Sequence, residues 1–363
     1  MARARLIRSI ALGVALLVGG WLVVSGPPGS SVPAVSAPPQ RTLRQAWPAA
    51  TVAVAPGRLA DGTQYSPGLY LDATTSVGVA ATPDGAAQRV LLRTGERVRE
   101  LTRAERERYP RFTSFTAAGG DVYWIESTAT ATQPLQHRLW KASLDGDAAA
   151  VPLTADTGDG EFPGGEHDLV VHDGRVYWAA ATGRDTEVRS VPLAGGPVTA
   201  AKVDGAYELS AWPWLQTAAA ARAGGRQELR NLDTGARVTV VKSAAETVDC
   251  GPVWCRSVVS AGTGGDTSYA VLHPDGTARR RVGGVDTFPA TGAVALLDRF
   301  EPVLQTGTRT AYDSTHRLAL YDIRTNRLVT LADDTDQALA RDHVVWWHQG
   351  DAWHALDLAQ LHD

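Results

Sequence analysis

The sequence predicts an all-β fold, a seven-bladed β-propeller of four-stranded antiparallel blades, preceded by an N-terminal membrane helix. Three observations predict this fold. A hairpin sequence recurs seven times along the chain, and an apolar strand precedes each copy. A further short apolar run comes before those strands, so each unit has four strands and repeats about every 40 to 50 residues, as is typical of propellers.

The clearest hairpin covers residues 137–146, His-Arg-Leu-Trp-Lys-Ala-Ser-Leu-Asp-Gly. An alternating strand leads into a turn at Asp145-Gly146, where glycine supplies the positive φ that a tight turn needs. In the sixth copy Asn326 takes the place of this glycine, and asparagine also tolerates the left-handed region. The other copies occupy residues 89–95, 188–196, 228–235, 269–276, 317–326 and 353–358.

The strand before each hairpin is the second strand of its unit. These strands are predicted at residues 76–80, 121–125, 175–179, 212–215, 252–255, 292–296 and 343–347. Five of them carry a tryptophan at a matching place: Trp124, Trp178, Trp214, Trp254 and Trp346. Stacked indoles could form a carbohydrate or choline site, but their regular recurrence favours packing between neighbouring blades.

The two ends of the repeat array complement each other. The seventh copy lacks its outermost strand, and residues 50–55 form a spare strand with no hairpin of their own. Pairing of these two segments would close the ring and leave no open blade edge. A β-sandwich is the structural alternative, but seven similar four-strand units exceed what a sandwich needs.

The N-terminus has the features of an export signal. Arg3, Arg5 and Arg8 precede an uncharged apolar run at residues 10–24. We interpret residues 1–26 as a signal anchor with a transmembrane helix and the arginines inside. Residues 27–46 form a Pro/Ser/Ala-rich linker, and residues 47–363 form the propeller. The chain is expected in the cell membrane, single-pass with an extracytoplasmic C-terminal domain, or secreted if the signal is cleaved.

The two cysteines, Cys250 and Cys255, flank Gly-Pro-Val-Trp. Outside the membrane they should oxidise, and their spacing suits a bridge that closes the turn between the first two strands of a blade. A redox-active pair is the alternative, but the spacing is not C-x-x-C.

The repeat resembles that of TolB-like propellers, of the secreted or membrane-anchored actinobacterial type. The resemblance is carried by residues 139–146, Leu-Trp-Lys-Ala-Ser-Leu-Asp-Gly, and 269–276, Tyr-Ala-Val-Leu-His-Pro-Asp-Gly. Residues 250–256, Cys-Gly-Pro-Val-Trp-Cys-Arg, are similar to a sequence found in such proteins. TolB itself carries an α/β domain before its propeller, for which this chain has no room. The resemblance therefore implies the fold and not a translocation role.

The loops at one rim of the propeller have an uneven charge. The links from a fourth strand to the next first strand include the acidic segments 155–168 and 331–336. Other acids in or just after such links are Asp204, Glu208, Glu246, Asp249 and Asp286, and the first link is basic, with Arg103, Arg106, Arg108 and Arg111. An acidic rim could bind a cationic partner or Ca²⁺, although no D-x-D-x-D-G loop occurs, and solvated loops are the alternative. Residues 300–316, a long insertion onto this rim, are the candidate recognition loop.

These features favour a non-catalytic binding or scaffold module, a monomer whose partner is a protein or a cell-envelope ligand. No cofactor is expected, since the chain has neither a P-loop nor a G-x-S-x-G elbow, and a net charge of −4 gives no support to nucleic-acid binding. The alternative is a propeller enzyme of lyase or hydrolase type at the channel mouth, using His167, Glu208 and Asp286. With Arg111, these are the candidate rim residues. A deep funnel with histidine and carboxylates within hydrogen-bond reach would favour the enzyme.

Overall fold

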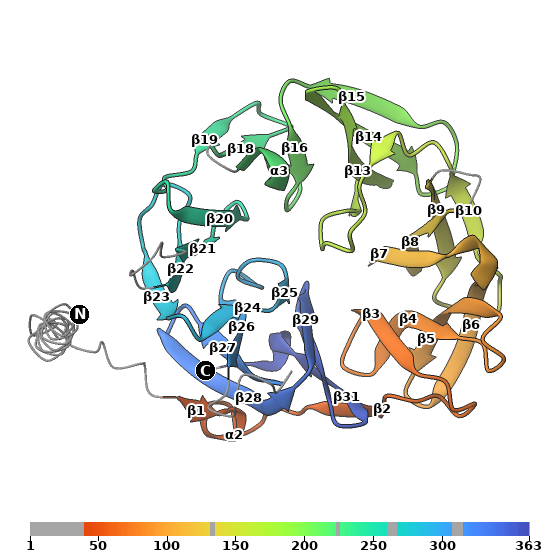
Figure 1. The fold of residues 1–363 in the computed structure, drawn as a ribbon, viewed down its shortest axis with the longest axis horizontal. Coiled ribbons are helices and arrows are strands. Elements are labelled where there is room, and N and C mark those ends of the chain that lie inside the picture. Colours follow the sequence, from red (N-terminus) through yellow and green to blue (C-terminus); the bar gives the residue numbers. More distant parts are fainter. Residues whose placement is uncertain (1–39, 131–134, 223–225, 260–266, 307–314, 363) are drawn as a thin grey trace, which may run out of the picture. The chain divides into compact units, whose positions relative to one another are not determined.

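A computed structural model describes residues 40–130, 135–222, 226–259, 267–306 and 315–362. These residues form seven sheets arranged in a ring, each built on four antiparallel strands (Figure 1). The all-β, seven-bladed prediction is confirmed. The signal anchor at residues 1–26 and the linker up to residue 39 lie outside the described residues, and no helix within the described ranges is long and apolar enough to span a membrane.

The first four blades follow one another in sequence. Blade 1 contains β3 (Tyr65–Tyr70), β4 (Thr75–Ala81), β5 (Ala87–Thr94) and β6 (Arg97–Glu105), and the short helix η1 (Arg106–Arg108) follows it. Blade 2 contains β7 (Arg111–Ala118), β8 (Asp121–Thr128), β9 (Gln136–Ser143) and β10 (Val151–Thr154). Blade 3 contains β11 (Asp159–Gly160), β12 (Val170–His172), β13 (Arg175–Thr182), β14 (Asp185–Pro192) and β15 (Thr199–Val203). Blade 4 contains β16 (Tyr207–Leu209), β17 (Trp214–Thr217), α3 (Ala219–Arg222), β18 (Glu228–Asn231) and β19 (Arg237–Thr239).

Three blades complete the ring. Blade 5 contains β20 (Glu246–Cys250), β21 (Cys255–Val259), β22 (Ser268–Leu272) and β23 (Arg280–Gly283). Blade 6 contains β24 (Thr287–Pro289), β26 (Phe300–Thr306), β27 (His316–Asp322) and β28 (Arg327–Thr335), with β1 (Arg41–Thr42) added at its outer edge. Blade 7 contains β29 (Gln337–Arg341), β30 (Val344–Gln349), β31 (Ala352–Asp357) and β2 (Ala53–Pro56), with β25 (Thr291–Gly292) at its inner edge and η2 (Leu358–Gln360) after β31.

The ring closes as the sequence predicts. Strand β2 pairs antiparallel with β31, from Ala53 opposite Ala355 to Pro56 opposite Ala352, and becomes the fourth strand of blade 7. Between blades 7 and 1, the indole Nε1 of Trp353 donates a hydrogen bond of 2.9 Å to the carbonyl oxygen of Tyr65. The N-terminal strand therefore occupies an edge that would otherwise expose unpaired backbone groups.

Residues 41–46, at the end of the predicted linker, lie against blade 6. Strand β1 pairs in parallel with β28, and the single-turn helix α2 (Leu43–Ala46) follows. Trp47 then packs edge-on against Phe300, with ring centroids 5.8 Å apart. Residues before the predicted boundary at 47 therefore also pack on the propeller.

The repeated tryptophans are packing residues. Trp124, Trp178 and Trp346 are at most 1% exposed, and Trp124 stacks on Trp140 of the neighbouring strand. The indole Nε1 of Trp178 donates to the carbonyl oxygen of Thr157 at 2.8 Å. Such rings fill the space that twisted sheets leave between blades, as expected from their regular recurrence.

The second strand of blade 6 was predicted in the wrong place. Residues 292–296 do not form it: β25 takes up Thr291 and Gly292, and the following residues enter the channel. The second strand is β26, which includes much of the predicted insertion at residues 300–316, whose residues 307–314 lie outside the described residues. Ala295 and Leu296 are at most 3% exposed, so burial inside the ring produced an apolar pattern that resembles a strand.

The predicted disulfide is confirmed. Cys250 and Cys255 are bonded, and they face each other at the ends of β20 and β21, the first two strands of blade 5. Trp254, predicted within the second strand, lies in the turn that this bond closes.

Replacing both cysteines by serine should lower the free energy of unfolding by about 2 kcal/mol, because the bridge restricts a short loop in the unfolded chain. Urea denaturation of the variant beside the oxidised wild-type protein measures the change. An equal midpoint for the two proteins would contradict the prediction, and wild-type protein kept reduced serves as the control, since it should match the variant.

Candidate functional site

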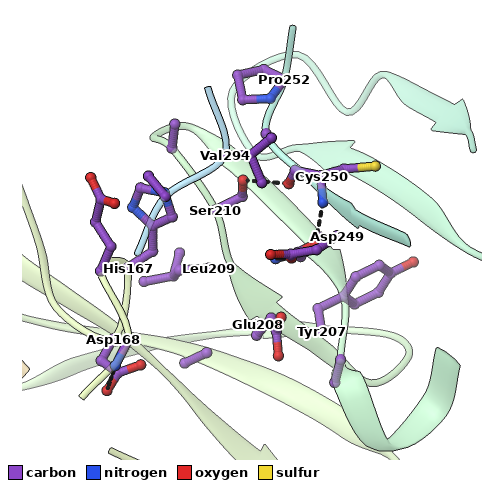
Figure 2. A pocket seen from close by; sticks show the side chains of 18 of the residues that line it. His167, Asp168, Tyr207, Glu208, Leu209, Ser210, Asp249, Cys250, Pro252 and Val294 are labelled. Carbon is purple, nitrogen blue, oxygen red and sulfur yellow. Dashed lines mark hydrogen bonds between the residues drawn. The ribbon is translucent and has the colours of Figure 1, made fainter. Parts of the chain in front are cut away.

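A cavity of about 690 Å³ lies in the central channel. Its walls come from the inner strands and loops of blades 3 to 6, with Asp342 contributed by blade 7. Figure 2 shows Pro252 and Val294 toward one end of the cavity, Asp168 and Glu208 toward the other, and His167 between them. A concave site with a few converging polar groups is the usual form of a ligand site.

The first wall is an excursion from the innermost strand of blade 3. That strand is divided into β11 and β12, which both pair with β13, and residues 161–169 leave the sheet between them. Phe162 and Leu169, 7% and 2% exposed, anchor the two ends in the blade core. The sequence placed this acidic segment in a rim link, whereas the structure turns its second half into the channel.

Two charged side chains hold this excursion in place. One carboxylate oxygen of Asp168 accepts hydrogen bonds from Ser114 Oγ at 2.6 Å and from the N–H groups of Gly164 and Gly165 at 2.8 and 2.9 Å. From blade 7, the guanidinium of Arg341 donates to the carbonyl oxygen of Gly165 at 2.7 Å and to that of Phe115. Arg341 therefore ties the excursion to blades 2 and 7, although these residues are far apart in sequence.

The second wall is the loop between β24 and β26. Gly292 pairs in parallel with β29, where a Cβ atom would lie 1.9 Å from the carbonyl oxygen of Ala340, so only glycine fits. Ala295, Leu297 and Asp298 all have positive φ, between 52° and 55°. Such conformations cost energy and are concentrated at functional sites, so this loop is held in its shape by its surroundings.

A buried ion pair supplies that support. Arg256 Nε lies 3.3 Å from Glu301 Oε1, and neither residue is more than 7% exposed. Arg256 also donates to the carbonyl oxygen of Gly292 at 2.9 Å, and Glu301 Oε2 accepts from the N–H of Ala295 at 2.7 Å. Tyr269 donates its hydroxyl hydrogen to Glu301, and burial raises the pKa of both groups. This pair therefore fixes the loop at Gly292 and at Ala295, where the strained residues begin.

The cavity is strongly acidic. Arg184 is the sole lysine or arginine in its described lining, whereas nine carboxylates contribute: Asp159, Glu161, Glu166, Asp168, Asp185, Glu208, Asp249, Asp298 and Asp342. Burial and, to a smaller extent, the nearby charge of Arg341 lower the pKa of His167 to about 4, so this imidazole is neutral at pH 7. It therefore does not offset the negative charge.

Among the described carboxyls of the cavity, Glu166 has the largest shift in pKa. Burial raises its pKa from the usual 4.5 to about 7, against the opposing effect of Arg341 and the backbone N–H of Asp342. Its Oε1 accepts from that N–H at 3.1 Å, whereas its Oε2 is shielded from solvent and has no hydrogen-bond partner in the described part of the chain. A carboxyl in this state is protonated about half of the time near neutral pH.

Glu166→Gln should change how stability depends on pH. The folded-state pKa is raised, so the wild-type protein loses stability as pH rises from about 4.5 through 7, by roughly 2–3 kcal/mol. Glutamine imitates the protonated acid, so the variant should match wild type below pH 4.5 and exceed it above pH 7. Urea denaturation at several pH values tests this, with Asp286→Asn as the control for the loss of one exposed charge outside the cavity. Parallel pH profiles of Glu166→Gln and wild type would refute it.

The structure separates the four candidate rim residues into two groups. His167 and Glu208 line the cavity, and Glu208 Oε2 accepts from the N–H of Ala219 at 3.3 Å. Arg111 begins β7 and Asp286 precedes β24; both are exposed and neither is part of the cavity lining. Glu166, Arg341 and Asp342 were not singled out from the sequence. The sole signal for Glu166 was its position in Gly-Gly-Glu-His-Asp beside His167.

The described residues hold no group of three or more His, Cys, Asp or Glu side chains arranged to bind a metal ion. Five of the cavity carboxylates, those of Glu166, Asp168, Asp185, Glu208 and Asp249, are instead engaged with backbone N–H groups or neighbouring side chains. Asp249, for example, accepts from Gln216 Nε2 at 3.1 Å, and Asp185 forms a 2.8 Å ion pair with Lys202.

Comparison with known proteins shows the fold alone. No protein-family model and no curated protein matches the sequence. The uncharacterized protein lmo1340 from Listeria monocytogenes EGD-e has a TM-score of 0.51 at 8% identity, with 81% of this chain and 92% of that chain covered. A puromycin-hydrolyzing peptidase of Mycobacterium tuberculosis has a TM-score of 0.50 at 16% identity, with 89% of this chain and 56% of that chain covered, so this chain spans about half of that peptidase.

TolB from Acinetobacter baumannii is also among the similar structures, with a TM-score of 0.40 at 9% identity and coverage of 78% of this chain and 64% of that chain. The seven-bladed ring is consistent with the resemblance to TolB-like propellers. Identities this low carry no information about activity, because propellers host many unrelated functions.

Proposed function

We propose that this chain is an extracytoplasmic, membrane-tethered binding module and that the channel cavity is its ligand site. The observation that supports this best is the cavity itself, about 690 Å³ in volume and lined by loops that buried ion pairs and a disulfide hold in place. A site shaped before the ligand arrives loses less conformational entropy on binding. The partner is a protein or cell-envelope ligand that inserts a group into this cavity.

The carboxylates of the cavity favour binding over catalysis. One oxygen of Asp168 accepts from three donors, and Glu166 uses one oxygen to hold the turn at Asp342. Within the described residues His167 forms no hydrogen bond to a carboxylate, so no oriented acid–base pair is present. Asp168 and Glu166 therefore help to maintain the structure of the cavity walls.

Blocking the cavity tests the proposal. Ala181, exposed on β13, is part of the lining, and Ala181→Trp should weaken ligand binding about tenfold, equivalent to ~1.4 kcal/mol, because the indole occupies part of the cavity. Val151→Trp, an equally bulky change on the outer strand β10, is the control and should bind as wild type does. Binding of a chemically mixed fragment set, observed by ligand-detected NMR, is the measurement. Equal binding by both variants would place the ligand site elsewhere.

A second candidate function is acid–base catalysis of hydrolase or lyase type in the same cavity. The observation in its favour is the pKa of Glu166, about 7, beside the neutral imidazole of His167. Recovery of the bound compound after prolonged incubation separates the two functions. An unchanged compound supports the binding module, whereas conversion that stops in Glu166→Gln supports the enzyme.

The membrane location rests on residues 1–26 and is tested separately. The full chain should sediment with membranes and resist extraction at alkaline pH, and its C-terminal domain should be digested by protease added to the outside of intact cells. A variant without residues 1–26 should be soluble. Release of the full chain into the medium would instead show that the signal is cleaved.

A further inference from the structure

We propose that the cavity binds an organic cation that carries an apolar group, with the charge near Glu166 and the apolar part against a lip at the Pro252 end. The inference rests on the proposed function and specifies the ligand of that site. An arylalkyl ammonium, or an amino group on a hydrophobic residue of a larger partner, has this chemistry.

The first argument is charge. Nine carboxylates and one arginine line the described cavity walls, and within the low-dielectric interior such an excess attracts cations and repels anions. Lys202 offsets Asp185 at the outer side, and the guanidinium of Arg341, which donates to carbonyl oxygens of the blade 3 excursion, adds a positive charge behind the wall. With Arg184, three cations therefore face the nine carboxylates. The middle of the cavity therefore keeps its negative charge.

The second argument is Glu166 itself. Its Oε2 is buried and has no hydrogen-bond partner in the described ranges, which is unusual for a carboxylate in a folded protein. The groups that face Glu166 are Arg341 and Asp342 from blade 7, the N–H of Ala293 from blade 6, the guanidinium of Arg256 from blade 5, and its neighbours in the excursion. A bound cation would add to the positive charge of Arg341 and favour the ionised form of Glu166.

The third argument is an apolar lip at one mouth of the cavity, formed by Pro252, Val253, Val294 and Leu297. Val253 and Leu297 are 39% and 51% exposed, and Figure 2 shows Pro252 and Val294 at this end, away from Glu208. Covering such surface is favourable by about 25 cal/mol for each Å². The disulfide beside Pro252 and the Arg256–Glu301 pair hold the two loops, so the lip exists before a ligand arrives.

The position of the ligand's charge near Glu166 predicts that binding changes the protonation of this residue. A cation near Glu166 favours its ionised form and lowers its pKa from about 7, so binding should release a fraction of a proton at neutral pH. Affinity should rise as pH increases from 5.5 to 8, as long as the ligand stays protonated. A rise in affinity over this pH range would identify Glu166 as the responsible group, because acids that are already ionised at pH 5.5 would give no such rise.

Calorimetric titration with phenethylammonium chloride, methylammonium chloride, phenethyl alcohol and phenylacetate tests the inference. Phenethylammonium should bind at least about tenfold more tightly than each of the other three, with affinity rising about tenfold between pH 5.5 and 8. Glu166→Gln should weaken its binding about tenfold at pH 8 and remove the pH dependence. Asp286→Asn is the matched control and should retain both, because Asp286 lies outside the cavity.

Equal binding of the amine and the alcohol, preference for phenylacetate, or unchanged affinity in Glu166→Gln would each overturn the inference. The first two results would leave the cavity as a binding site for another class of ligand, so the proposed function would survive. Absence of binding by all four probes, together with equal fragment binding by Ala181→Trp and Val151→Trp, would overturn both proposals.

Discussion

Replacing Arg256 by methionine is expected to lower the free energy of unfolding by about 3–5 kcal/mol, because it leaves a buried carboxylate without its cation. Glu301 is fully buried, and the same change frees the carbonyl oxygen of Gly292 from its 2.9 Å hydrogen bond. The loop that forms one cavity wall loses its anchor, so binding in the cavity should also weaken. Urea denaturation and ligand titration measure the two effects.

Two controls make this result specific. Arg317→Met removes an exposed arginine whose Nε lies 2.9 Å from Asp333 Oδ1, and it should cost about 1 kcal/mol or less, because surface ion pairs contribute little. The double variant Arg256→Met/Glu301→Gln should lose less free energy of unfolding than the two single variants lose together, since it leaves no uncompensated charge. Equal losses for Arg256→Met and Arg317→Met would contradict the assigned role.

Removing the closing strand is the second change with a large expected effect. A chain that starts at residue 57 lacks β2 and Trp47, and should lose about 4 kcal/mol or more of stability, because β31 becomes an open edge and the contact with Phe300 disappears. Thermal unfolding and size-exclusion chromatography are the measurements, and exposed β31 should also promote aggregation.

The matched control is a chain that starts at residue 40, which keeps β1, α2 and β2 and should unfold as the full chain does. A peptide of residues 40–56 added to the shorter protein should restore part of the stability by strand addition. A monomeric protein starting at residue 57 with an unchanged unfolding temperature would show that the N-terminal strand does not close the ring.

The fold could be predicted because its information is local and repeated. Alternation in residues 137–146 and the turn at Asp145-Gly146 depend on neighbouring residues alone, and seven copies remove the ambiguity of one. The prediction failed in the sixth unit, whose second strand does not directly follow the apolar run before it. Residues 292–296 are apolar because they are buried inside the ring, and periodicity cannot distinguish that burial from a strand.

The candidate site could be predicted in part. His167 and Glu208 lie in the cavity because they are in or just after links that lead to the channel, and that position could be read from the strand order. Arg111 and Asp286 occupy similar places in sequence but are exposed outside it. His167 reaches the cavity through the excursion at residues 161–169, whose path depends on Ser114 and Arg341, far away in the chain, whereas Glu208 lies on the inner strand β16.

The sequence by itself therefore determined the propeller, its closure by the N-terminal strand and the disulfide at Cys250 and Cys255, because each depends on a repeated pattern or on short spacing. The tertiary structure decided which acids share one cavity and which of them is protonated near neutral pH. The pKa of Glu166 reflects burial and the charge of Arg341, which lies 175 residues later in the sequence. Burial and long-range contacts are properties of the closed ring, and no local pattern encodes them.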